Sequence, residues 1–171
     1  EFYARVNYGK SCEYFINSDT VVTGKNSNFL GHFLHGIKLK SYNFNKYKTK
    51  KETRIISINI LGIKNKPSTN MQLKFQALEE GTFYARDLVS EPGNILHPDE
   101  YAKRLMSLKK NGLKVNIYDK KKLKKLGMFS LLGVGMGSVR GSYLVTMEWN
   151  GAKNNTKPVA FVGKGVTFDT G

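Results

Sequence analysis

The chain has 171 residues, enough for one ordinary domain or for a small domain followed by part of another. Its 40% hydrophobic content, with four prolines against seventeen glycines, excludes a disordered chain and predicts a packed core. No stretch approaches eighteen consecutive apolar residues, so we expect a soluble protein without a membrane partner. Lys and Arg outnumber Asp and Glu by 28 to 13, a net charge of +15 that raises nucleic acid as a partner.

The distribution of the lysines and the single cysteine indicate how to interpret the charge and the compartment. Most of the excess charge is lysine scattered among asparagines, as in 43–51 and 150–157, which usually forms a solvated surface. The lone Cys12 excludes an intrachain disulfide and a thiolate metal site, and it favours a reducing compartment, here the cytoplasm. The chain begins at Glu1 without a charged-then-apolar leader, so we expect a truncated N-terminus and no secretory signal.

The first half of the chain contains two helical patterns and one strand pattern. Apolar residues recur at three and four over 28–48, which predicts an amphipathic helix with a lysine-rich end that frays into a loop. The isoleucine-rich stretch 54–61 ends at Gly62 and predicts a strand. Residues 69–89 form the longest helical pattern, which we interpret as a bridge between two domains. Residues 1–25 carry no pattern that we can place.

The second half alternates helices with strands. After a loop at 90–97, Pro98 and the two acids behind it predict the first turn of a helix that ends near Gly112. The elements that follow are a strand at 114–118, a helix capped by Asp119 and ended by Gly127, an alternating strand at 143–149, and a buried strand at 158–162. This alternation is typical of an α/β fold.

The last thirteen residues, VAFVGKGVTFDTG, are the most informative part. A buried strand opens into glycines around Lys164, and Asp169 follows five residues later. Ligands of open α/β sheets bind outside the carboxyl ends of strands, so both side chains are candidates for a site. A phosphate loop is excluded because Gly165 stands where Ser or Thr should follow the lysine. A structural turn with a surface lysine stays open from this segment alone.

Several blocks resemble one known family. Residues 162–171, VGKGVTFDTG, closely resemble the metal-binding signature of the leucine (cytosol) aminopeptidase family. The blocks 85–94, ARDLVSEPGN, and 126–138, LGMFSLLGVGMGS, are similar to family segments in the same order and at about the same spacing. The segment 42–51 is also similar to the end of the family's N-terminal domain, so the resemblance covers most of the chain after about residue 28.

The resemblance implies a two-domain α/β fold. We expect a small N-terminal α/β domain at 1–67, truncated at its start, and a linker helix at 68–89. An incomplete α/β catalytic domain with a mixed sheet would follow at 90–171. The resemblance also implies a homohexamer that acts on peptides with a free N-terminus.

The resemblance further implies that Lys164 and Asp169 are two of five protein ligands of a pair of divalent ions, zinc, manganese or magnesium. Lysine binds a metal only as the neutral amine, which the cation itself and partial burial would favour. The other ligands, the catalytic lysine and the arginine that holds a bicarbonate base would all lie beyond Gly171. We therefore expect no catalytic residue within this chain and no peptide hydrolysis by it, although the parent would release N-terminal residues, leucine-like by preference.

Other candidate groups have simpler interpretations. The glycines of 133–141 miss the dinucleotide-loop spacing, because Arg140 replaces the third glycine, and a tight turn is expected. His32 and His35 lie one helical turn apart without an acidic neighbour in sequence, so we expect a surface or core role. Residues that we interpret as structural are His97 at a helix start, Arg86, Asp87 and Glu91 in ion pairs that lock the linker helix onto the catalytic domain, and the solvated cluster 120–125.

Two other functions stay open at this point. The charge of +15 fits a nucleic-acid-binding protein, which a salt-dependent shift of a random duplex would reveal. An inactive relic of the same family that serves as an oligomer scaffold is the other alternative.

Overall fold

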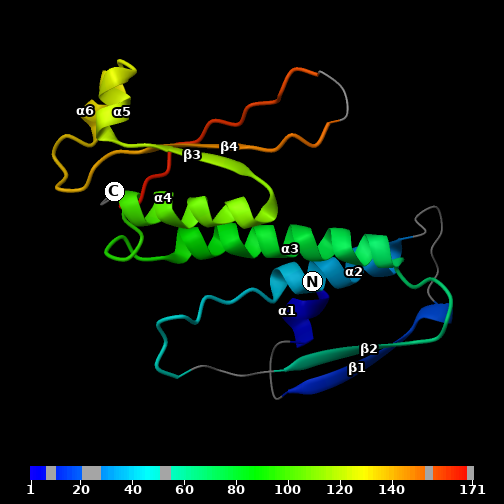
Figure 1. The fold of residues 1–171 in the computed structure, drawn as a ribbon. Helices are drawn as coiled ribbons and strands as arrows, with labels where there is room; N and C mark the ends of the chain where they lie inside the picture. Colours follow the sequence, from blue (N-terminus) through cyan, green and yellow to red (C-terminus); the bar gives the residue numbers. More distant parts are fainter. Residues whose placement is uncertain (7–10, 21–27, 51–54, 153–155, 169–171) are drawn as a thin grey trace. The chain divides into compact units, whose positions relative to one another are not determined.

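The computed structural model describes residues 1–6, 11–20, 28–50, 55–152 and 156–168. The chain forms two compact units, Glu1–Ser90 and Glu91–Gly171. Each unit combines helices with a two-stranded sheet, which confirms the α/β class (Figure 1). Within the described ranges, no helix has both the length and the apolar character needed to cross a bilayer.

The sheet of the first unit consists of β1 (Cys12–Asn17) and β2 (Ile56–Leu61), which pair in parallel. The predicted strand is confirmed from Ile56 onward, whereas Arg54 lies outside the described residues. Side chains alternate along β1 between half-buried and exposed, as a strand covered on one face requires. β1 lies within residues 1–25, where we could predict no element.

Helices cover one face of this sheet. α1 (Phe2–Val6) links the layers, because the Phe2 ring lies 5.4 Å from the rings of both Tyr14 on β1 and Phe33 on α2. α2 (Phe29–Lys40) packs in turn against α3 (Thr69–Ser90), the helix that the sequence predicts at 69–89. Phe75 of α3 is among the most buried side chains of this unit.

The helix predicted over 28–48 ends at Lys40, and its far end is a loop, as predicted, although the loop begins earlier than the apolar pattern indicates. The Ser41 N–H and hydroxyl both hydrogen-bond to carbonyls of the last turn, which satisfies acceptors that a helix end leaves free. Tyr42 then leaves the helical path and packs its ring 5.3 Å from that of Phe83. Tertiary packing of one aromatic side chain thus overrides the helical periodicity.

The second unit follows the predicted order closely. Its elements are α4 (Pro98–Met106), η2 (Ser107–Asn111), β3 (Lys114–Tyr118), α5 (Lys120–Lys125), α6 (Phe129–Val134) and β4 (Leu144–Glu148). Gly112 ends η2 with a left-handed φ of 85°, which a residue without a Cβ adopts most easily. The Asp119 carboxylate caps α5 by accepting the Lys122 N–H at 2.9 Å.

The core of the second unit lies where α4 and α5 meet the antiparallel pair of β3 and β4. Val115 on β3 and Leu123 on α5 are 2% and 0% exposed, and Leu96 and Ala102 are also buried. Gly135 and Gly137 lie in the predicted turn, which directly follows α6, and the Met136 N–H donates to the Gly133 carbonyl of that helix. Strands that would make this sheet mixed are not among the described elements.

The predicted buried strand at 158–162 is wrong as a local structure. The segment is extended but belongs to no sheet, and Val159, Phe161 and Val162 are 80%, 95% and 98% exposed. A strand is stabilised only when its N–H and C=O groups pair with a neighbour, and the described residues offer this segment no such partner.

Candidate metal site

Lys164 lies in the final described segment of the chain, residues 163–168. This segment is neither helix nor strand, and Lys164 is exposed. The Val166 N–H donates to the Lys164 carbonyl at 3.2 Å, so the backbone turns tightly just after the lysine. Asp169, the second predicted ligand, lies outside the described residues. The pairing of Lys164 with Asp169 therefore stays a prediction.

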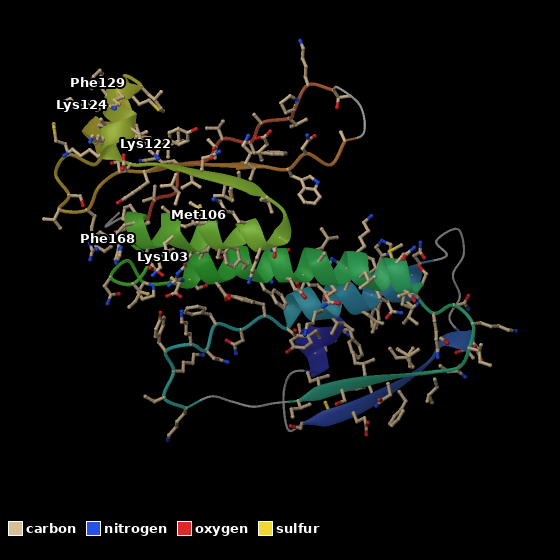
Figure 2. The ribbon with its side chains drawn as sticks, in the orientation of Figure 1. Lys103, Met106, Lys122, Lys124, Phe129 and Phe168 are labelled. Carbon is tan, nitrogen blue, oxygen red and sulfur yellow. The ribbon has the colours of Figure 1, made fainter. Side chains whose placement is uncertain are left out.

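The final segment contacts the loop before α4 and the first turn of α4. Figure 1 shows the red end of the chain passing down to the start of this helix, and Figure 2 labels Phe168 there. A Cβ placed on Gly93 would lie 2.9 Å from the Thr167 carbonyl oxygen and 3.2 Å from the Phe168 Cβ. A Cβ placed on Gly165 would lie 2.8 Å from Cε1 of Tyr101. Both glycines thus sit where a side chain would not fit without movement.

A buried ion pair fixes the loop 91–97 to α4. The Glu91 side chain is 1% exposed and accepts a hydrogen bond from Nη1 of Arg104 at 2.8 Å. Nε of Arg104 also donates to Glu100 at 3.0 Å. Hydrogen bonds to these two carboxylates raise the pKa of Arg104, so the guanidinium stays charged. Glu91 forms the predicted ion pair, but its partner lies within the second unit.

The N-terminus of α4 carries a second set of polar contacts. His97 is the N-cap, as its predicted place at a helix start implies, and its ring contacts the Asp99 carboxylate. Arg140 donates to the other Asp99 oxygen at 3.1 Å. Burial raises the pKa of Asp99, but the hydrogen bonds from its own backbone N–H and from His97, together with the Arg140 charge, outweigh that effect and lower it.

The two histidines of α2 have structural roles, as predicted. The His35 ring stacks on Phe75 with centroids 4.6 Å apart, and His32 meets the same ring edge-on. No acidic residue lies near these histidines in sequence, but the fold brings Nδ1 of His35 to 2.8 Å from Glu79 on α3. No group of three or more His, Cys, Asp or Glu within the described ranges is placed to hold a metal.

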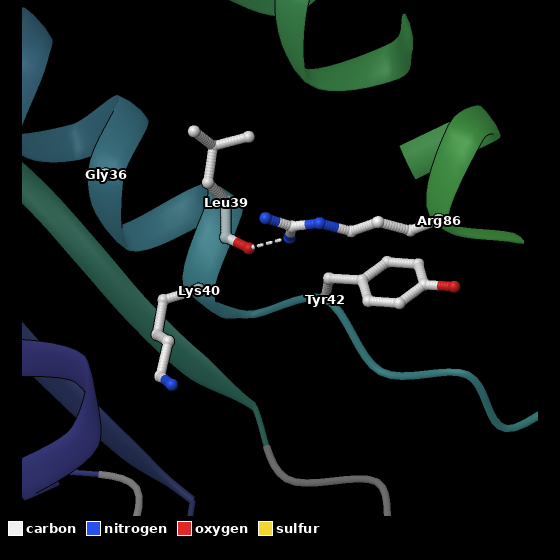
Figure 3. A pocket seen from close by; sticks show the side chains of 5 residues that line it. All are labelled: Gly36, Leu39, Lys40, Tyr42 and Arg86. Atoms are coloured by element: carbon white, nitrogen blue, oxygen red, sulfur yellow. Dashed lines mark hydrogen bonds between the residues drawn. The ribbon is translucent and has the colours of Figure 1, made fainter. Parts of the chain in front are cut away.

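Arg86 and Asp87 differ from the prediction. Arg86 donates to the Leu39 carbonyl at the end of α2 (Figure 3), and the Tyr42 hydroxyl donates to Asp87 at 2.8 Å. Both partners belong to the first unit, so these side chains hold α3 to the end of α2. Gly36 and Lys40 complete the lining of a pocket of about 430 Å³ here.

The comparisons with known proteins concern the same part of the chain. A sequence model described as the cytosol aminopeptidase family, catalytic domain, matches residues 83–171. A probable cytosol aminopeptidase of Bradyrhizobium sp. is 45% identical over 140 residues, 80% of this chain. One of Brucella ovis is 46% identical over 142 residues, again 80% of this chain.

This chain belongs to the cytosol aminopeptidase family. It spans 28% and 29% of the length of these two relatives. The resemblance that the signature suggested is therefore confirmed at the level of the family.

Solved structures agree on the fold. The cytosol aminopeptidase from Coxiella burnetii matches 89% of this chain with a TM-score of 0.70 and 20% identity, and 31% of its own chain is covered. The bottromycin maturation enzyme BotP in complex with Mn matches 87% of this chain with a TM-score of 0.64 and 21% identity, again over 31% of its own chain. The aminopeptidase fold thus extends beyond the residues of the family match.

Sequence reasoning missed the residues that contact the signature. Gly93 follows a proline in a loop, so it is interpreted as a turn glycine, and Tyr101 is one aromatic residue of an amphipathic helix. Neither residue carries a local signal for its contact, because the partners lie more than sixty residues later in the chain. Unexplained glycines in two separate blocks of the resemblance are the only sequence hint.

Proposed function

We propose that this chain is the N-terminal domain and the beginning of the catalytic domain of a two-metal aminopeptidase. The parent enzyme would release N-terminal amino acids from peptides, with leucine-like residues preferred. The observation that carries the proposal is the catalytic-domain match over 83–171, which includes both Lys164 and Asp169. The relatives named above are described as probable cytosol aminopeptidases.

Lys164 and Asp169 would hold the metal ions. A lysine amine and a carboxylate are nitrogen and hard oxygen donors, a mixed set that suits zinc or manganese, with magnesium as a further possibility for the carboxylate. A pair of such ions supplies an activated water and a polarised carbonyl for hydrolysis. Lys164 is exposed, so the cation itself, and not the expected partial burial, would have to favour the metal-binding form of its amine. The name of the BotP structure supports manganese as the first probe.

The two proposed ligands can be tested directly by titration calorimetry with MnCl₂ on the 171-residue chain. Lys164→Ala removes a donor and Asp169→Asn replaces a charged carboxylate by a neutral amide, so each should weaken Mn²⁺ binding by at least the roughly tenfold that outer-shell substitutions cost. Lys157→Ala is the matched control, since it removes an exposed lysine that lies outside the signature. Equal affinity in all four proteins would contradict the ligand assignment.

The chain by itself should not hydrolyse peptides. Two protein ligands do not complete a dinuclear site, and the family resemblance puts the remaining ligands and catalytic groups outside this sequence. The test is an assay with leucine amide or leucine anilide in the presence of Mn²⁺. Clear turnover by the purified chain would refute the proposed inactivity.

The same family suggests the compartment, the assembly and the general base of the parent enzyme. We propose a cytoplasmic homohexamer that acts on peptides with a free N-terminus and uses bicarbonate as a general base. Sedimentation of the intact parent would test the assembly, and a dependence of its turnover on added bicarbonate would test the base.

Nucleic-acid binding is a second candidate for one specific reason. Five lysines of α5, at 120, 121, 122, 124 and 125, are exposed, while Leu123 alone points into the core. Such a face attracts phosphate and releases counterions, so any binding must weaken steeply as salt rises. A solvated surface accounts for the same lysines. An unshifted random duplex at low salt would remove this candidate.

A further inference from the structure

The signature segment does not stand free of the second unit. Residues 165–168 contact two fixed points, which are Gly93 in the loop before α4 and Tyr101 in the first turns of α4. Both contacts fall between Lys164 and Asp169, the two ligands proposed above. We propose that Gly93 and Tyr101 are positioning residues that set the backbone path between these ligands, an inference that rests on the proposed function.

The contact at Gly93 is with backbone. A Cβ at this position would lie 2.9 Å from the carbonyl oxygen of Thr167, a separation that real Cβ atoms essentially never show. It would also lie 3.2 Å from Cβ and Cδ2 of Phe168. Backbone cannot rotate away as a side-chain tip can, so a methyl group here must displace residues 167 and 168 themselves. The displaced residues directly precede Asp169.

The contact at Tyr101 is with the ring and not with the hydroxyl. A Cβ on Gly165 would lie 2.8 Å from Cε1, 3.4 Å from Cδ1 and 3.8 Å from Cζ of this ring. The Gly165 α-proton that points in this direction therefore rests against the edge of the aromatic ring. Because the ring carbons make the contact, Phe should replace Tyr101 and Ala should not.

The loop that carries Gly93 and the helix that carries Tyr101 are fixed by their own contacts. Glu91 is buried two residues before Gly93 and is bound to Arg104 on α4. The Leu96 N–H donates to the Pro92 carbonyl at 2.9 Å, which closes the loop into a compact turn. The loop and the helix that carry the two contacts are thereby tied to each other, as positioning groups around a metal site require.

The glycines themselves supply matched controls. Gly163 lies in the same segment, two residues from Gly165, but a Cβ added to it meets nothing within 4 Å. Gly133 on α6 is equally open. The same methyl group can thus be added with and without a collision.

The first measurement is made on the labelled, metal-free 171-residue chain by NMR. The Gly165 α-proton shift should depart from its random-coil value through the ring current of Tyr101, should lose that departure in Tyr101→Ala and should regain it in Tyr101→Phe. Gly93→Ala should move the amide signals of residues 167 and 168, whereas Gly133→Ala should leave them in place. A Gly165 signal unchanged by Tyr101→Ala would overturn the proposed contact. Retained far-UV circular dichroism would show that each variant is folded.

The second measurement adds MnCl₂ as the only ligand. Gly93→Ala, Tyr101→Ala and Gly165→Ala should each weaken Mn²⁺ binding by about tenfold, the lower end of the usual effect of outer-shell substitutions. Tyr101→Phe and Gly163→Ala should bind Mn²⁺ like the unsubstituted chain. If the chain binds Mn²⁺ and the three colliding variants bind it equally well, the positioning role is wrong. If the unsubstituted chain does not bind Mn²⁺ while the NMR contacts are present, the metal proposal is wrong instead.

Discussion

Two regions of the second unit differ sharply in how they are held. The loop 91–97 and α4 are fixed by a buried ion pair, an N-cap and a core residue with 4% exposure, Leu96. The segment 158–162, PVAFV, has a more apolar sequence than that loop and helix, yet Phe161 is 95% exposed and no described strand pairs with it. The difference shows that apolar composition alone does not bury a segment. Partners for its backbone and its side chains decide whether it is buried.

Removing Arg104 should have the largest effect on stability, because Arg104 is one half of the buried ion pair that fixes the loop 91–97 to α4. Arg104→Ala leaves the Glu91 carboxylate, 1% exposed, without its guanidinium partner. We expect a loss of about 3 kcal/mol in the free energy of unfolding, the low end for a buried pair because Arg104 is 23% exposed. Urea unfolding followed by far-UV circular dichroism measures this loss. Lys103→Ala, at a side chain 83% exposed, is the control, and an equal loss in both variants would contradict the account.

Removing the cap of α5 should have a smaller effect. Asp119→Ala takes away the carboxylate that accepts the Lys122 N–H, which costs about 1 kcal/mol in typical helices. The same urea titration detects this loss. Asp119→Asn retains an acceptor at the cap and should recover most of the stability, so a large loss in the Asn variant would count against capping as the cause.

Acid should weaken the fixed region through Asp99. Because the folded state lowers the pKa of this carboxyl below 3.8, its contribution is present above that pH and is lost as the pH falls through the lowered value. The unfolding temperature of the second unit, measured from pH 5 down to pH 2, should therefore fall less steeply in Asp99→Asn than in the unsubstituted chain. Identical slopes would show that Asp99 is not the group responsible.

The exposed segment should tolerate change. Phe161→Ser removes a side chain that is 95% exposed, so the free energy of unfolding should change by less than about 0.5 kcal/mol. Solubility should instead improve, because an exposed apolar residue promotes association. A loss of stability comparable to that of the Arg104 variant would mean that Phe161 is buried in solution, and the contrast between the two regions would fail.

The sequence predicts those parts of the fold that are specified locally. Pro98 with its following acids, Asp119 and Gly112 mark element boundaries by backbone chemistry, and the structure has boundaries at each of them. The predictions that fail concern segments whose structure depends on distant partners. The helix of 28–48 stops early because Tyr42 packs on Phe83, and the strand of 158–162 is absent because pairing is not a local property.

The candidate site divides in the same way. Lys164 and Asp169 are predicted as ligands because residues 162–171 resemble the family signature, and both lie within those ten consecutive residues. The contacts of Gly93 and Tyr101 with that segment bring together residues far apart in the chain, so they become visible only in the folded structure.

The central claim, that Lys164 and Asp169 bind one metal centre, is tested most directly by a Mn²⁺ titration followed residue by residue. In the ¹⁵N-labelled 171-residue chain, paramagnetic broadening should begin at the amides nearest residues 164 and 169 and then spread to residues 165–168. The Asp169→Asn variant should lose this early broadening. Broadening that begins elsewhere, or that is the same in the variant, would contradict the metal assignment.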